Sequence, residues 1–244
     1  MEKLFDIAQQ ITDARKHEIP QQLVKLRQLI NQNYDQNFKH EIYKLNLLDA
    51  LSTSFKYDYG YIRDGWELAL ELVKIFRDCV HNFFLTDKEY QNDLLPNSLE
   101  NVLILSKKIQ EKYNKGKSFK NLNFKELEEL FRLFKSIHNE YCKIVSNHSY
   151  LAQKSFNSQR LFQLLLNDDQ KTTTVVIQTY NSILNTKNSI LRTLPESVLN
   201  SFLDEIIYKL ASNEQSETGN AIFQLLVTMC KIDTYLIKLI ARRY

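Results

Sequence analysis

The composition of this chain of 244 residues limits the folds that it can adopt. Its four glycines and three prolines are too few for the many turns of a sheet-rich fold or for a loop that cradles phosphate. The formal net charge is +3 with both signs mixed along the chain, which is too weak to indicate binding to nucleic acid or to acidic lipid. Leu, Ile, Lys, Glu and Gln are abundant and favour helix, so we predict an all-α protein.

The cysteines and the N-terminus indicate an intracellular protein. Cys79, Cys142 and Cys230 form an odd, widely spaced set inside apolar runs, as expected of reduced and buried thiols. Met1 is followed by an amphipathic segment rather than an apolar leader, and no apolar run approaches the length of a membrane span. We therefore expect a cytoplasmic location, with the nucleus as the alternative, and no membrane partner.

Apolar residues at helical spacing begin at the N-terminus. They predict helices at about 2–16, after Pro20 and at about 37–56. The aromatic segment 55–66 holds two of the glycines and the only tryptophan, and it predicts a turn that leads into a long buried helix at about 62–84.

A polar segment follows the next predicted helix, at 98–113, whose start resembles a capping box of Asn97 and Glu100. This segment, 112–120, contains Gly116 and predicts a mobile loop between an N-terminal and a C-terminal half. The lysines here are either favourable charges near a helix C-terminus or a contact for phosphate or an acidic partner: Lys107, Lys108, Lys112, Lys115, Lys117 and Lys120.

The C-terminal third of the chain repeats itself. Three kinds of segment recur at an offset of about 45 residues: an apolar run with a polar turn, a second apolar run, and a short segment that opens with a hydroxyl residue. The pairs are 161–170 with 206–215, about 175–184 with 221–229, and 189–191 with 234–236. A partial third copy lies in a predicted helix at 124–146 and in 149–151. Further helix starts are predicted at Ser158 and at Pro195.

The repeat over about 124–241 resembles armadillo and HEAT repeats. The run ending at Cys142, with the turn centred on Asn147, is also similar to ataxin-10-type armadillo proteins. The resemblance implies an armadillo-like right-handed superhelix, or α-solenoid, that serves as an intracellular scaffold without catalysis. We expect a single helical repeat domain over 1–244. Its N-terminal half, 1–113, would have irregular helices, and 123–244 would have clearer repeats.

In such an architecture the second helix of each unit lines a groove, here about 124–146, 171–186 and 217–232. The best-known armadillo proteins carry a ladder of asparagines in this groove, and it grips an extended peptide. The nearest positions in this chain are Ile183 and Thr228, so the resemblance does not extend to that mode of peptide capture.

No catalytic residue, cofactor or metal is predicted. Residues 116–118, Gly-Lys-Ser, imitate the end of a phosphate loop but lack its upstream glycine. His138 and Cys142 share a helix face and could reach one metal ion, but two ligands do not close a zinc site, so core packing is the stronger interpretation.

We predict a non-enzymatic scaffold or adaptor that binds a protein partner through the groove or a terminal face. The candidate contacts are Arg132, Lys135, Gln178, Gln224 and Thr228, with Tyr59 and Trp66 as an N-terminal aromatic patch. The alternatives are an all-α enzyme or ligand-binding bundle, which needs convergent polar groups in a pocket, and a nucleic-acid-binding solenoid, against which the mixed charge argues. The C-terminal helix lacks a polar cap sequence, so we expect either that further repeats follow it in a longer protein or that it joins two copies of the chain.

Overall fold

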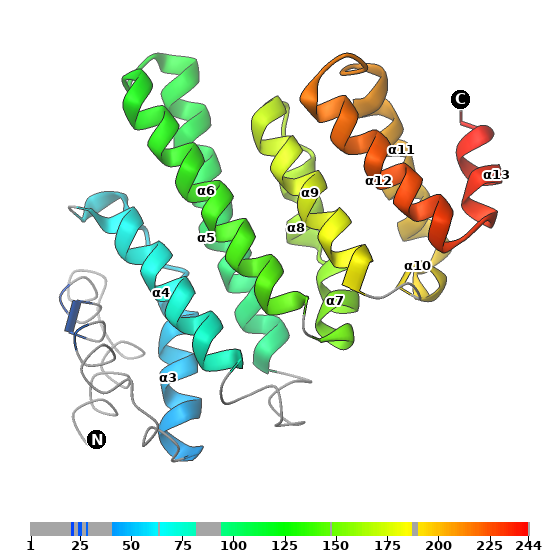
Figure 1. The fold of residues 1–244 in the computed structure, drawn as a ribbon. Helices are drawn as coiled ribbons and strands as arrows, with labels where there is room; N and C mark the ends of the chain where they lie inside the picture. The colour runs from blue at the N-terminus through cyan, green and yellow to red at the C-terminus, as the bar shows by residue number, and fades with distance from the viewer. Residues whose placement is uncertain are drawn as a thin grey trace. The chain divides into compact units, whose positions relative to one another are not determined.

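The computed structural model describes residues 41–62, 64–81, 94–146, 148–186 and 190–243, and before residue 41 only Gln21, Val24, Lys25 and Gln28 (Figure 1). Every regular element in these ranges is helical, as predicted. None of the helices described is long and apolar enough to cross a bilayer. The chain divides into two compact units, Met1–Lys112 and Tyr113–Tyr244, and each is described by itself. The prediction of a single domain over 1–244 stays a prediction.

The first unit contains helix α3 (Glu41–Ser54), the short 3-10 helix η1 (Tyr59–Tyr61), helix α4 (Gly65–Cys79) and the part of α5 (Leu95–Phe119) that ends at Lys112. Phe55 and Phe76 meet edge to face, with ring centroids 5.5 Å apart, in a core that excludes water from both rings. The Asn101 side chain of α5 donates to the Ser52 hydroxyl of α3 at 2.8 Å. The predicted helix at 2–16 lies outside the described residues.

The predicted aromatic turn joins α3 to α4. Asp64 has a left-handed backbone (φ 53°), and Gly65 then begins α4 with its backbone against the Tyr59 carbonyl oxygen. A Cβ on Gly65 would overlap that oxygen, so the chain needs a glycine where the turn meets the helix.

In its described residues, the second unit contains the end of α5 and eight further helices. They are α6 (Phe124–Val145), α7 (Ser149–Phe156), α8 (Gln159–Leu165), α9 (Gln170–Thr186), α10 (Ile190–Thr193), α11 (Glu196–Ala211), α12 (Glu217–Ile232) and α13 (Tyr235–Ala241). Helix α9 packs between α6 and α12 and also contacts α7 and α8. Figure 1 shows α6, α9 and α12 side by side, with α8 behind α9 and α11 behind α12. Each pair of repeated segments forms a corresponding pair of helices: α8 with α11, α9 with α12, and α10 with α13.

Helix starts in the second unit follow local sequence signals. Asn123 and Glu126 form a reciprocal capping box at the start of α6, each side chain accepting from the other residue's backbone N–H at 2.9 Å. The Ser158 side chain caps α8, and Pro195 precedes the first residue of α11, as predicted. Each signal lies within a few residues of the helix start that it determines. Helix starts of this kind can therefore be predicted from the sequence.

Two predictions for the segment before α6 are wrong, the capping box of Asn97 and Glu100 and the loop at 112–120. Helix α5 begins at Leu95, so Asn97 and Glu100 are not its capping box, and it continues to Phe119 through the predicted loop 112–120. Gly116 is the physical reason, because a Cβ there would lie 2.5 Å from Leu122 Cδ1. The bare helix surface at Gly116 lets the turn and α6 pack closely, and this tertiary contact outweighs the low helix propensity of glycine.

Helix α9 is built from residues that disfavour helix when isolated. Its segment 172–177 is Thr-Thr-Thr-Val-Val-Ile, all β-branched and all buried. The threonine hydroxyls are satisfied by backbone carbonyls: Thr173 donates to Asn167 and Thr174 to Gln170, each at 2.9 Å. Packing against neighbouring helices and these hydrogen bonds, rather than propensity, hold α9 in place.

Gly219→Ala is expected to destabilise the second unit by about 2 kcal/mol. Gly219 lies buried in the first turn of α12, and a Cβ there would overlap the Asn213 carbonyl oxygen and come within 3.1 Å of the Glu214 carbonyl oxygen. Thermal unfolding followed by circular dichroism would measure the change. Asn220→Ala, at the exposed next position, is the matched control and should alter stability by less than about 0.5 kcal/mol. Equal melting temperatures for the two variants would contradict the steric argument.

Candidate partner-binding surface

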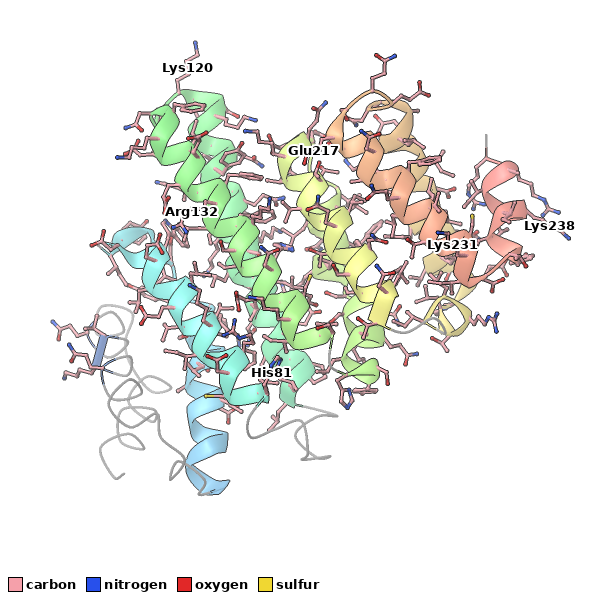
Figure 2. The ribbon with its side chains drawn as sticks, in the orientation of Figure 1. His81, Lys120, Arg132, Glu217, Lys231 and Lys238 are labelled. Carbon is pink, nitrogen blue, oxygen red and sulfur yellow. The ribbon has the colours of Figure 1, made fainter. Side chains whose placement is uncertain are left out.

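One side of the α6–α9–α12 layer is open to solvent. Because α6 and α12 flank α9 while α7 and α8 cover its back, the exposed residues of α9 lie on the remaining side. We call this side the three-helix face and define it by the exposed residues Arg132, Lys135, Asn139, Gln178, Ser182, Asn185, Gln224 and Lys231. Figure 2 shows Arg132 on α6 and Lys231 near the end of α12.

Four of the five candidates in the second unit are exposed on this face: Arg132, Lys135, Gln178 and Gln224. Thr228 is half-buried, and its hydroxyl donates to the Gln224 carbonyl at 3.0 Å, so it can only accept from a partner. The structure therefore brings the predicted residues onto three packed helices, as expected of residues chosen by helical phase.

The two aromatic candidates of the first unit are less exposed than the four exposed candidates of the second unit. Tyr59 is fully buried, and its hydroxyl donates to the Ser54 carbonyl at 3.1 Å, so the prediction that it contacts a partner is wrong. Burial raises the pKa of this hydroxyl, because it disfavours the phenolate. Trp66 is half-buried against Tyr59, whereas Tyr61 is 87% exposed. Residue type alone could not show which tyrosine of the turn points inward.

Sequence reasoning missed Asn139, Ser182, Asn185 and Lys231. Each lies three or four positions after a predicted residue on the same helix, or one further turn along, so helical spacing was the signal that could have found them. Their addition extends the face toward the C-terminal ends of all three helices.

The defining residues of the face are mainly cations and amides, and the exposed carboxylates of Glu128, Glu129 and Glu217 lie in the N-terminal parts of α6 and α12. The Arg132 guanidinium pairs with Glu129 one turn earlier on α6. Lys135 and Lys231 are exposed and have no ion-pair partner among the described residues. Asn139, Gln178, Asn185 and Gln224 each present an amide, which both donates and accepts hydrogen bonds. This chemistry suits a polar polypeptide, neutral or acidic, laid across the three helices.

A buried polar cluster lies behind the face. His138 is 1% exposed, and its Nδ1 lies 2.9 Å from Thr179 Oγ1. Because the Thr179 hydroxyl donates to the Val175 carbonyl, the imidazole must donate through Nδ1, and Nε2 is left as a buried acceptor with no partner among the described residues. Desolvation lowers the pKa of His138 to about 3, so the ring is neutral. No group of three or more potential metal ligands occurs in the described part of the chain.

Two hollows open on the second unit away from these defining residues. A polar hollow of about 750 Å³ lies between the end of α5 and the α8–α9 loop, where Lys117 pairs with Asp169 at 2.5 Å. The Asp169 carboxylate also accepts from the Thr172 backbone N–H at the start of α9, so this residue is fixed by structural bonds. An apolar hollow of about 290 Å³ is bordered by the aromatic cluster of Phe156, Tyr180 and Phe202.

The chain matches no protein family and no solved structure. Among curated proteins it is similar to the human IQ calmodulin-binding motif-containing protein 1, with 25% identity over 237 residues, which cover 94% of this chain and 39% of the relative. The mouse protein of the same name is 23% identical over 239 residues, with the same coverage. The chain thus spans 39% of the length of these relatives, whose names refer to a motif for binding another protein.

Proposed function

We propose that this chain is a non-enzymatic protein-interaction module of the cytoplasm, which binds a polypeptide segment of a partner protein across the three-helix face. One observation carries the proposal: α6, α9 and α12 pack in one layer and expose a row of amides and cations, with the exposed carboxylates of Glu128, Glu129 and Glu217 confined to the N-terminal parts of α6 and α12. The names of the relatives support a protein partner rather than a small molecule or a nucleic acid.

We also propose that the second unit is an armadillo-like repeat array. The support is the recurrence of one helix order, in which α8, α9 and α10 correspond to α11, α12 and α13, while α6 and α7 supply a partial copy. Helices that pack mainly on the next copy bury a continuous core, as α9 does between α6 and α12.

The binding mode differs from an asparagine ladder. Ile183 is 1% exposed and belongs to the core, and the Thr228 hydroxyl donates to its own helix. Gln178 on α9 and Gln224 on α12 are the exposed amides, and we propose that they hydrogen-bond to the backbone of the partner while Lys135 and Lys231 attract its acidic residues.

Site-specific photocrosslinking tests this surface. With a photoreactive phenylalanine analogue at Gln178 or Gln224, we expect a crosslinked partner, whereas the same analogue at Tyr208 of α11 should give none. Tyr208 is 69% exposed and lies on a helix behind α12, so it is a matched control. Purified calmodulin, with and without Ca²⁺, is the first partner to test because of the relatives' names, and cell extract is the second.

The double variant Lys135→Glu and Lys231→Glu should lower the crosslink yield about tenfold, since it reverses two charges on the face. Lys154→Glu on α7 changes an exposed lysine outside the face and should leave the yield unchanged. Equal crosslinking from Tyr208, or the same yield from the charge-reversed face, would contradict the proposed surface.

Self-association through the C-terminal helix stays a prediction. Leu236 and Leu239 of α13 are buried, while Tyr235 and Ile237 are 54% and 51% exposed. Light scattering of the wild type and of Ile237→Lys would test whether this exposed apolar pair joins two copies.

A further inference from the structure

We propose that the tip of the α5–α6 hairpin docks on the surface of an anionic phospholipid membrane. The tip comprises residues 115–125, which form the last turns of α5, the connecting turn and the start of α6. This inference is independent of the proposed protein-binding face, because the two surfaces share no residue.

Two phenylalanine rings flank the turn and face solvent. Phe119 ends α5 and is 71% exposed, and Phe124 begins α6 and is 73% exposed. A single exposed apolar side chain needs no explanation, but two large exposed rings at the end of one hairpin are unusual for a surface that meets only water. Aromatic rings on such a protrusion are suited to the boundary between headgroups and acyl chains.

The same tip concentrates positive charge. Lys115, Lys117, Lys120 and Lys125 lie within these eleven residues, and no Asp or Glu does. Lys117 pairs with Asp169, whereas the other three are exposed and have no ion-pair partner in the described ranges. Each lysine close to an anionic leaflet gains from its negative surface potential. The small net charge of the whole chain conceals this local excess.

The turn directs these side chains outward and holds them there. Lys120 adopts a left-handed backbone (φ 51°) that ends α5, and Figure 2 shows its side chain pointing away from the hairpin. Leu122 occupies the inner position against Gly116, so the phenylalanines on either side of it remain outside. The capping box of Asn123 and Glu126 fixes the exit into α6. The side chains of the tip therefore already point toward solvent in the unbound protein.

A membrane surface fits this tip better than a protein does. The exposed rings lie at the end of the α5–α6 hairpin, outside the polar hollow that Lys117 and Ser118 line, so a protein partner would have to supply a cleft for them, whereas a leaflet accepts them without one. The nearest carboxylates limit how deeply the tip can enter. Asp169 pairs with Lys117, Glu126 is engaged in the capping box and Glu129 pairs with Arg132, whereas Asp168 and Glu128 are exposed. The expected contact is thus interfacial, which requires no membrane-spanning segment.

Co-sedimentation of the full chain with vesicles tests the inference. We expect the protein to sediment with vesicles of phosphatidylcholine mixed with phosphatidylserine and to remain in solution with phosphatidylcholine alone, and added salt should weaken the binding. The double variants Phe119→Ser with Phe124→Ser, and Lys120→Glu with Lys125→Glu, should each lower the bound fraction about tenfold or more.

Matched control variants distinguish binding through the tip from non-specific adsorption of the protein to vesicles. Phe223→Ser removes a ring that is 62% exposed on α12, and Lys231→Glu reverses a charge in the last turn of α12, away from the tip (Figure 2). Both should bind vesicles like the wild type, and circular dichroism should show all variants folded. No binding by the wild type, or equal binding by the tip and control variants, would overturn the proposal. Loss with the lysine variant but not with the phenylalanine variant would also overturn it, because it would show that charge alone binds the vesicles and that the rings do not enter the leaflet.

Discussion

Phe134→Ala is expected to destabilise the second unit by about 3–5 kcal/mol, the largest effect of any single substitution considered. Phe134 is fully buried in α6, and its ring centroid lies 4.6 Å from that of His138. Truncation removes the apolar surface of the ring and leaves a cavity in the layer where α6 packs on α9. Urea unfolding followed by far-ultraviolet circular dichroism would measure the loss.

The control for this substitution is on the same helix. Phe124 begins α6 and is 73% exposed, so Phe124→Ala makes the same chemical change without opening a cavity. It should shift the free energy of unfolding by less than about 0.5 kcal/mol. Comparable losses for both alanine variants would mean that Phe124 is buried in solution, which would also remove a ring from the proposed membrane tip.

The stability of the second unit should fall steeply as the pH drops below 6.5. The pKa of His138 is about 3 in the folded chain and near 6.5 when unfolded, so between these values the unfolded chain binds more protons. Stability therefore rises with pH across this window and is lost as the pH falls, by about 1.4 kcal/mol per unit at most. The expected loss from this group at pH 5 is about 2 kcal/mol.

Urea unfolding at several pH values between 7 and 5 would test this, with His138→Leu as the diagnostic variant. Leucine cannot be protonated, and the Thr179 hydroxyl keeps its bond to the Val175 carbonyl, so the variant should lose most of the slope. His148, whose pKa burial also lowers, adds a smaller slope of the same sign because it is partly exposed. An unchanged slope in His138→Leu would contradict the role assigned to His138.

The sequence predicted best where local signals agree with packing. The predicted helix at 124–146 agrees with α6 within one residue because the apolar residues at helical spacing lie in the sequence itself. The segment 112–120 was misassigned because Gly-Lys-Ser resembles a loop locally, while the contact of Gly116 with Leu122 that favours helix forms only after the hairpin closes.

Exposed residues could likewise be predicted only where the local sequence pattern determines which side of a helix faces solvent. Gln178 and Gln224 could be predicted because helical phase identifies the exposed side once the inner side is apolar. The burial of Tyr59 depends on the Ser54 carbonyl that accepts its hydroxyl, and no residue pattern reveals that pairing. The exposure of Phe119 and Phe124 could not be predicted either, because it depends on Leu122 occupying the inner position against Gly116.

The β-branched composition of helix α9 creates a risk of aggregation while the chain is being synthesised. Its segment 172–177 is a run of six uncharged β-branched residues, a composition that favours strand pairing between chains when it is not packed. During synthesis α9 leaves the ribosome before α12 exists to cover it, a delay of some 30 residues or more. The nascent chain therefore passes through a stage at which this β-branched segment is packed against α6, α7 and α8 but not yet against α12. Any lesion that delays α12, including the glycine substitution described above, should increase aggregation during expression more than its effect on the finished fold would suggest.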